Sequence, residues 1–575
     1  MKNFIVTLFL FFGMLSAYGQ WVENQGIPIV TEGTSIYDNK TVVGKDGTTY
    51  FLGYCPNLKE AEDEYDTDNV VYEYRLQAID KNGVRKFGDL GLLISDYPNR
   101  SYCVVNDYLY LDKEGNIIVV VFDARAHEYE DLMGAYAYKI SPEGEMLWGE
   151  DGVLLGNGRD LVAAMRMVEL TDGSIVFAWM RSHGQLLAID LQRITAKGEP
   201  QWEPTEVGLN DETVTYQYPY LVDAGMNQFI LVYAKGGAQD LYARKMDFDG
   251  TSVWSEDTRI YRGGWGSIPL WTILDVKPSG DGGVILGWND DRSMTNIETA
   301  YMSYVTKDGE IGFSGASDNG DVKLNYSEFR NFNCKVMADP AGDGFLAFWR
   351  ETSEGQSWQR MVMQKVSKEG ELLYGDEGVM IADFEETNFG YNSIQPGNEG
   401  EAALFYMRQN AGYGDVDVLY ITFKTETGEF LMEEPHRLIA GTQERSSMTS
   451  HVCQEEGFWI LKWKEDYKDE NNNTQEKHLL YRLDYRVNDT TSVENMITIS
   501  DNFYHSNEKF MVKVANAGKA QIEIFDLMGR KIDDINNVEL NAGLNTIAWT
   551  NKSGAYIAKM TVNNEVLLTC KILIK

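Results

Sequence analysis

The 575-residue sequence predicts an all-β protein: an eight-bladed β-propeller closed by an N-terminal strand, followed by a small immunoglobulin-like β-sandwich. Three observations lead to this prediction. A turn glycine followed four residues later by a large side chain recurs through the chain. A second series of turn glycines opens strands that end in an aromatic residue. Both series stop near residue 490, which gives boundaries of 20–490 for the propeller and 491–575 for the sandwich.

The first series has seven members, and its spacing is constant. Each glycine follows Asn, Glu, Lys, Asp or Thr, which are typical of tight hairpin turns. The three tryptophans in the series are predicted to pack between neighbouring blades. The pairs are Gly83–Phe87, Gly144–Trp148, Gly198–Trp202, Gly250–Trp254, Gly309–Phe313, Gly370–Tyr374 and Gly428–Met432.

The second series predicts eight first hairpins, against seven second hairpins from the first series. Its members are Gly47, Gly115, Gly173, Gly283, Gly344, Gly400 and Gly457, with Asn227 in the remaining place. The segment "GQWVENQGIPIV" resembles the end of the repeat, and the last repeat stops at "LLYRLDYRV" without a final strand. We therefore expect the N-terminal strand to complete the last sheet and hide two sheet edges. A stack of separate sandwich domains is the alternative, but the units are short and have no linkers.

The spacing of an acidic residue, Gly, three residues and Trp resembles the tryptophan-docking repeat of eight-bladed quinoprotein-type propellers. The resemblance covers the scaffold alone. The vicinal cysteine pair that those dehydrogenases commonly carry is absent from this sequence. Non-enzymatic relatives of that scaffold use the ring as a binding platform, and the resemblance implies the same possibility for this chain.

Residues 1–19 have the features of a secretory signal peptide. Lys2 precedes the apolar run "FIVTLFLFFGML", and Ala17 and Gly19 are small residues at the positions that a signal peptidase inspects. The run is short for a membrane span, and no later stretch is apolar enough to cross a bilayer. We expect an exported protein, either extracellular or on the outer face of the outer membrane, with no transmembrane segment.

The last stretch of about 80 residues, which includes "AQIEIFDLMGRKI", is similar to the C-terminal sorting domain of type IX secretion substrates of Bacteroidota. The matching residues are Asp526, Gly529, Arg530, Gly543, Gly554, Tyr556, Lys571 and Lys575. The segment "ISDNFYHSNEKF" lacks the proline that this family usually has at the start of the domain. The resemblance implies type IX machinery as a partner, removal of the tail and attachment to surface lipopolysaccharide. The alternative is an ordinary immunoglobulin-like module that stays attached.

Composition and motifs limit the partners, metal sites and reactions that the sequence supports. A net charge of -37 excludes nucleic acid as a partner, because nucleic-acid binding needs a basic face. The five cysteines form no C-x-x-C pair, and the six histidines have no partners at metal-ligand spacing. No hydrolase, zinc-protease or phosphate-binding motif is present. The sequence favours a non-catalytic binding or adhesion function, with a carbohydrate-active enzyme (a glycosidase or lyase with its site on the loop face) as the alternative.

Long acidic loops and isolated aromatics supply the candidate sites. Three acidic loops are predicted to cluster, where they form either a solvated rim or a calcium site. Trp265 and Tyr413 are candidates for binding a surface glycan or a protein partner, whereas Trp271, Phe332 and Tyr391 are expected to pack inward. The candidate calcium ligands are Glu62, Asp63, Glu64, Asp66, Asp68, Asp466 and Asp469.

Overall fold

The computed structural model divides the chain into two compact units, Met1–Val487 and Asn488–Lys575. The structure describes residues 26–30, 37–57, 71–97, 108–123, 125, 134–156, 162–237, 240–263, 274–295, 297–409, 416–439, 445–468, 472, 474–485, 503–506, 509–514, 517–526, 530–541, 543–549, 554–562 and 565–574.

The described part of the first unit is built from eight antiparallel sheets, and the first four come from its N-terminal half. The first sheet contains β2 (Tyr37–Val43), β3 (Thr49–Asn57), β4 (Val71–Ile79) and β5 (Leu92–Ser95). The second contains β6 (Tyr108–Leu111), β7 (Ile117–Asp123), β8 (Gly134–Ile140) and β9 (Val153–Leu154). The third contains β10 (Val162–Glu169), β11 (Ile175–His183) and β12 (Leu186–Ile194), and the short helix α2 (Pro204–Val207) follows it. The fourth contains β13 (Tyr216–Gly225), β14 (Gln228–Lys235), β15 (Asp240–Asp247) and β16 (Thr258–Tyr261).

The remaining four sheets follow in chain order. The fifth contains β17 (Asp275–Pro278), β18 (Val284–Asp290), β19 (Thr299–Val305) and β20 (Asp321–Lys323). The sixth contains β21 (Arg330–Ala338), β22 (Phe345–Thr352), β23 (Gln359–Val366) and β24 (Val379–Glu385). The seventh contains β25 (Asn388–Pro396), β26 (Glu401–Gln409), β27 (Val416–Lys424) and β28 (His436–Ile439). The eighth contains β29 (Arg445–Cys453), β30 (Phe458–Lys468), β31 (Thr474–Asp484) and the distant β1 (Ile27–Pro28).

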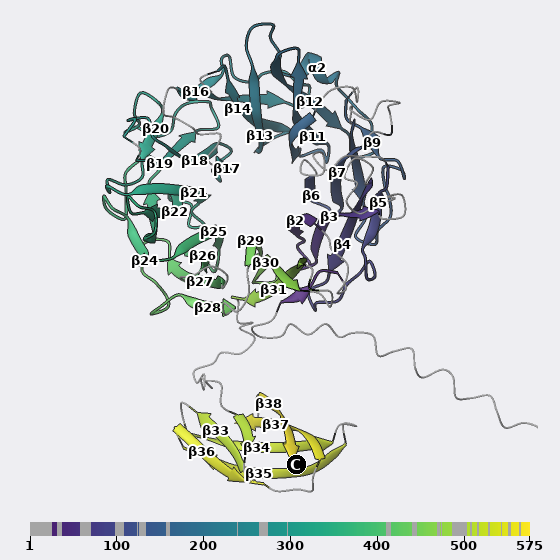
Figure 1. The fold of residues 1–575 in the computed structure, drawn as a ribbon, viewed down its shortest axis with the longest axis vertical. Helices are drawn as coiled ribbons and strands as arrows, with labels where there is room; N and C mark the ends of the chain where they lie inside the picture. The colour runs from purple at the N-terminus through teal and green to yellow at the C-terminus, as the bar shows by residue number, and fades with distance from the viewer. Residues whose placement is uncertain are drawn as a thin grey trace, which may run out of the picture. The chain divides into compact units, whose positions relative to one another are not determined.

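The sheets of the first unit are arranged in a ring with their first strands toward its centre, the arrangement of a β-propeller (Figure 1). The first strand of each sheet contacts the first strand of the next, in the order β2, β6, β10, β13, β17, β21, β25 and β29, and β29 contacts β2. The second strands are buried on both faces, as in β7, where all seven residues are buried. Apolar residues on both faces of these strands form the cores between successive sheets.

The large side chains of the repeat dock on the turn glycines of the following repeat. Gly198 has a φ of +88°, and a methyl group there would come within 2.9 Å of the Trp148 ring. The Trp148 indole Nε1 also donates to the carbonyl of Ala196 at 3.1 Å. The same contact recurs at Gly144 with Phe87, Gly250 with Trp202, Gly309 with Trp254, Gly370 with Phe313 and Gly428 with Tyr374. These contacts confirm the predicted packing role of the tryptophans.

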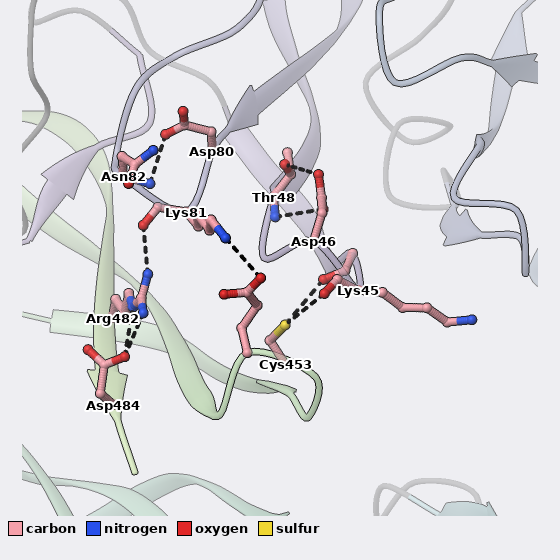
Figure 2. A network of polar contacts seen from close by, with 11 residues as sticks. Lys45, Asp46, Thr48, Asp80, Lys81, Asn82, Cys453, Arg482 and Asp484 are labelled. Carbon is pink, nitrogen blue, oxygen red and sulfur yellow. Dashed lines mark hydrogen bonds and ion pairs between the residues drawn. The ribbon is translucent and has the colours of Figure 1, made fainter. Parts of the chain in front are cut away.

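The junction of the first and last sheets joins segments about 400 positions apart in sequence (Figure 2). The Arg482 guanidinium donates to the Lys81 carbonyl at 2.8 Å, and the Lys81 ammonium pairs with Glu456 at 2.9 Å. The Cys453 thiol donates to the carbonyl of Gly44 at 3.4 Å. The turns of the first sheet are therefore bonded directly to the last sheet.

β1 lies antiparallel to β31 at this junction, with Ile27 opposite Leu480. The Ile29 amide donates to the carbonyl of His478 at 3.0 Å, and the Ile29 side chain is fully buried. The Arg85 guanidinium, which follows β4, donates to the carbonyls of Pro28 and Ile29. Residues 26–30 are thus bonded to both the first and the last sheet, while Trp21 lies outside the described residues.

The second unit contains two antiparallel sheets in its described part. One is built from β32 (Phe503–Ser506), β33 (Lys509–Val514) and β36 (Gly543–Ala548). The other has the order β35 (Lys531–Leu540), β34 (Gly518–Asp526), β37 (Gly554–Val562) and β38 (Glu565–Ile574). Ile522, Ile524, Ala558 and Met560 are buried, and the Phe510 and Trp549 rings stack at 5.5 Å. Among the described residues of the whole chain, no helix is long and apolar enough to cross a membrane.

Candidate functional site

Several of the first strands, which lie nearest the centre of the ring, carry a recurring β-bulge. In β25, the register with β26 shifts between Gly390 and Ser393, and Tyr391 adopts a φ of +47°. A bulge bends the strand and redirects a side chain, and a non-glycine residue at positive φ is uncommon. The equivalent residues of the other described bulges with a positive φ are Ala164, Tyr218, Asn333 and Ser447.

Four consecutive first strands enclose a cavity of about 940 Å³, which we call the inner-strand cavity. Its lining comes mainly from β17, β21, β25 and β29, with Arg350 of β22 beside them. Amide and hydroxyl side chains provide much of the polar lining: Asn333, Asn388, Asn392, Ser393, Gln395, Thr449, Ser450 and Gln454. Concave sites of this size, with a few convergent polar groups, are the usual form of a ligand-binding pocket.

Hydrogen bonds between successive first strands hold the cavity wall in place. The Asp275 carboxylate accepts from the Val336 amide at 2.9 Å and so joins β17 to β21. The Asn392 side chain donates to the carbonyl of Asn333 at 3.0 Å and joins β25 to β21. The Gln395 side chain donates to the carbonyl of Ser450 at 2.8 Å and joins β25 to β29. Packed and hydrogen-bonded walls favour a preformed site.

The position of the Tyr391 side chain differs from the sequence-based prediction, which expected it to pack inward. It is 50% exposed and lines the inner-strand cavity. The bulge explains the difference: Asn392, the next residue, takes the buried position, while the positive φ turns Tyr391 away from the core. The prediction assumed an uninterrupted alternation of side chains along the strand, and that assumption was wrong. Trp271 lies outside the described residues, and Phe332 is partly buried.

Arginine–carboxylate pairs recur in every described sheet of the first unit. Each sheet contains or directly adjoins at least one arginine within 3.0 Å of a carboxylate oxygen. The pairs are Arg75–Glu73, Arg125–Asp123, Arg181–Asp190, Arg244–Asp257, Arg292–Asp290, Arg360–Glu351, Arg408–Asp417 and Arg445–Glu465. Buried guanidinium groups are costly unless they are paired, and these pairs satisfy that requirement.

Arg350 departs from this arrangement. Its Nη1 donates to the Asn388 side-chain oxygen at 3.0 Å and to the Phe389 carbonyl at 2.6 Å. Its Nε is buried without a hydrogen-bond acceptor, and among the described residues no carboxylate forms an ion pair with it. Burial lowers the pKa of Arg350. The cavity wall therefore contains a guanidinium whose charge no described protein group neutralises.

Two lysines and a histidine complete the basic part of the cavity. Lys277 extends from β17 and is paired with Asp275 at 3.6 Å, whereas Lys335 of β21 has no ion-pair partner among the described residues. Burial, together with the positive charges of Lys462 and Lys277, lowers the pKa of His451 to about 4. His451 is therefore neutral near pH 7, and its buried Nε2 has no hydrogen-bond partner in the described part of the chain.

Most of the sequence-predicted site residues lie outside the part of the chain that the structure describes. Those outside the described residues are Trp265, Tyr413, Glu62, Asp63, Glu64, Asp66, Asp68, Asp469, Gly529 and Lys575. Asp466 is on β30, where its carboxylate lies 3.5 Å from the Lys464 ammonium. Among the described residues, no group of three or more His, Cys, Asp or Glu side chains is placed to hold a metal ion. Calcium binding stays a prediction.

The tail residues singled out from the sequence fall mainly on strands. Asp526 and Tyr556 are register partners between β34 and β37, and Gly543 begins β36 opposite Val514. Gly554 begins β37, and Lys571 of β38 is opposite Ile557. Arg530 is exposed just before β35. These positions describe the strands that the motif occupies and leave its role in sorting as a proposal.

Sequence reasoning missed Arg350, Lys335 and His451 as site residues. Arg350 directly follows Trp349, the aromatic residue that ends a strand of the second glycine series. The sequence feature that could have indicated Arg350 as a site residue is a basic side chain at that position, one residue before Glu351, whose carboxylate is paired with Arg360. Arg350 and Lys335 share the sixth sheet and His451 is on the eighth, and spacing in the sequence alone does not reveal that all three line one cavity.

Comparisons with known proteins give the following result. No protein-family model matches the chain, and no curated protein sequence matches it. Among solved structures, the chain is similar to the Dos1 propeller, with a TM-score of 0.40 and 10% identity over 80% of this chain and 95% of that chain. The chain is also similar to the polysaccharide lyase Uly1, with a TM-score of 0.39 and 11% identity over 82% of this chain and 94% of that chain. For the GH93 α-L-arabinofuranosidase of Fusarium graminearum the TM-score is 0.30 and the identity is 11%, over 56% of this chain and 93% of that chain. Similarity at this level does not extend to activity or ligand.

Proposed function

We propose that the chain is an exported surface protein whose closed, eight-bladed β-propeller binds a saccharide in the inner-strand cavity. The observation that carries this proposal is the cavity of about 940 Å³ between β17, β21, β25 and β29. Its amide and hydroxyl side chains match the hydrogen-bonding needs of sugar hydroxyls, because they donate and accept. The half-exposed ring of Tyr391 offers an apolar face with a polar tip, on which a pyranose ring can stack.

Eight blades and closure are supported by the contacts between successive first strands and by the pairing of β1 with β31. A closed ring hides the edges of the first and last sheets and fixes the relative positions of the strands that line the cavity. The ring acts in this proposal as a rigid, non-catalytic platform, and the cavity as its binding site.

Delivery to the cell surface rests on the two ends of the chain. We assign residues 1–19 to a signal peptide and residues 491–575 to a type IX sorting domain of immunoglobulin-like fold. The Asp526–Arg530 segment and the Gly554–Tyr556 strand start are the residues that support the second assignment. The type IX machinery is then a partner of the tail, and the propeller meets its saccharide outside the cell.

A glycan array probed with the full chain tests this function. Tyr391→Asn removes the aromatic face, and asparagine tolerates the positive φ. Tyr218→Asn is the matched control, because Tyr218 has the same bulge position and a φ of +52° but does not line the cavity. We expect the first variant to lose binding to the array hits and the second to keep it. Equal binding by both variants would show that the cavity is not the site.

A second candidate function is carbohydrate cleavage by β-elimination. The observation that favours it is that Arg350, His451 and Tyr391 line the same cavity. A neutral histidine is a competent general base, a tyrosine is a proton donor, and an arginine stabilises a carboxylate next to the abstracted proton. Incubating each bound glycan with the full chain and following absorbance of the unsaturated product distinguishes the two functions. Product release indicates a lyase, and binding without product indicates a platform.

A further inference from the structure

We propose that the saccharide bound in the inner-strand cavity is acidic, and that Arg350 binds its carboxylate or sulfate group. This inference rests on the proposed function, since it names the ligand class of the same cavity. It goes beyond that function because a neutral saccharide would satisfy the amides, the hydroxyls and Tyr391 equally well. The decisive residue is a guanidinium that the fold leaves without a counter-ion.

The surroundings of Arg350 show that the fold positions it but does not neutralise it. Its Nη1 is fixed by two neutral acceptors, the side chain of Asn388 and the carbonyl of Phe389. Its Cζ lies 5.3 Å from the centre of the Phe332 ring, which orients the guanidinium plane. A held guanidinium without a carboxylate is suited to bind an external anion, because planar donors match carboxylate and sulfate oxygens.

The residue after Arg350 on β22 is acidic, but its carboxylate is already paired with another arginine. Glu351, the next residue, is fully buried and is already engaged by the Arg360 guanidinium at 2.7 Å. The Trp349 indole and the side chain of Ser327 also donate to Glu351. Its carboxylate is consequently committed to the other face of β22 and does not pair with Arg350.

Charge in the cavity is opposite in sign to charge on the chain as a whole. The chain carries -37, with 88 acidic against 51 basic residues. The lining residues include three basic side chains, Lys277, Lys335 and Arg350, against two acidic ones, Asp275 and Asp339. The Asp339 carboxylate is already paired with Lys365 at 2.6 Å. A basic cavity in an acidic protein focuses its attraction for anions on one place.

Lys335 is placed to assist Arg350. It is the register partner of Phe348 on β22, two residues before Arg350, so both side chains lie on one face of the sixth sheet. That face packs toward the seventh sheet, which contributes Phe389 and Tyr391 to the region. Two cations and one exposed aromatic ring on neighbouring strands are the arrangement expected for a sugar ring that carries an acid group.

Affinity electrophoresis of the full chain through acidic polysaccharides tests the inference. A carboxylated set and a sulfated set are each compared with their carboxyl-reduced or desulfated products, and poly-glutamate is included as an acidic polypeptide. We expect retardation by at least one acidic polysaccharide and loss of retardation when its acid groups are removed. The set that retards the chain identifies the anion as carboxylate or sulfate.

Variants separate the role of Arg350 from general basicity. Arg350→Gln is expected to weaken binding about 10- to 100-fold, as for the loss of a charge-assisted hydrogen bond. Arg350→Lys retains the charge and should recover part of the affinity. Arg166→Gln is the matched control, because Arg166 is on first strand β10, lies over the Tyr220 ring and is outside the cavity lining. Unchanged unfolding midpoints of all three variants show that they remain folded.

Three results would overturn the inference. Equal retardation by the reduced and acidic polymers, with binding still lost in Tyr391→Asn, would leave the saccharide function standing and refute the acidic ligand. Binding by Arg350→Gln equal to that of Arg166→Gln would also refute it. Retardation by poly-glutamate and by no polysaccharide would refute the inference together with the saccharide function.

Discussion

Replacing Ile29 by alanine should destabilise the first unit, because Ile29 joins its first and last sheets. The side chain is fully buried in a cluster that includes Phe51 of β3, Ile460 of β30 and Leu480 of β31. Ile29→Ala removes three carbon atoms, and their transfer to water costs about 2.4 kcal/mol at about 0.8 kcal/mol each. The remaining cavity adds to this cost, so we expect a loss of about 3 kcal/mol within the usual range of about 2–5 kcal/mol.

Urea unfolding of the full chain, followed by tryptophan fluorescence, measures this loss. Val253→Ala is the control, because Val253 is 42% exposed and its truncation should change the free energy of unfolding by no more than about 0.5 kcal/mol. The parent and control curves should coincide, and the Ile29→Ala midpoint should fall. If the Ile29→Ala curve also coincides with the parent curve, residues 26–30 do not hold the first and last sheets together.

Three further predictions concern pH, secretion and calcium. Burial lowers the pKa of His478 to about 3, so between pH 6.5 and 5 the unfolded chain binds a proton that the folded chain does not. His478 should lower the free energy of unfolding by about 2 kcal/mol over that interval, and His451, whose pKa burial lowers to about 4, should lower it by a similar amount. His478→Leu should therefore remove about half of the total fall, and a variant with the same pH slope as the parent contradicts the assignment. Removing residues 495–575 should leave the first unit folded but retained in the periplasm of a host with type IX secretion, whereas normal surface delivery would refute the sorting role. Calcium should give saturable calorimetric heat and a higher unfolding temperature than magnesium if the acidic loops bind it, and equal responses would indicate a solvated rim.

The repeat could be predicted from the sequence because its physical cause is local. A turn glycine at positive φ and a large side chain four residues later are both fixed by short-range geometry, and Gly198 with Trp148 shows how successive repeats interlock. The all-β architecture of four-stranded antiparallel sheets follows from that repetition. The pairing partner of the N-terminal segment could be inferred as well, because an unmatched final strand at one end complements a missing strand at the other.

The inner-strand cavity could not be predicted in the same way. Tyr391 reaches the cavity through a bulge, and a bulge shifts the alternation of side chains without a clear mark in the sequence. In the described part of the chain, the lack of a carboxylate beside Arg350 can be recognised only once the charged side chains have been located in space. Abundant acidic residues drew attention to the long loops, whereas the proposed site depends on two cations, Arg350 and Lys335, that have no ion-pair partner among the described residues.

A crystal structure of the full chain with an acidic oligosaccharide tests the central claim most directly. The account predicts electron density for the sugar between β17, β21, β25 and β29, with an acid group at hydrogen-bond distance from Arg350 and a ring face against Tyr391. Sugar bound on the loops or on the second unit, with the inner-strand cavity unchanged, would contradict it.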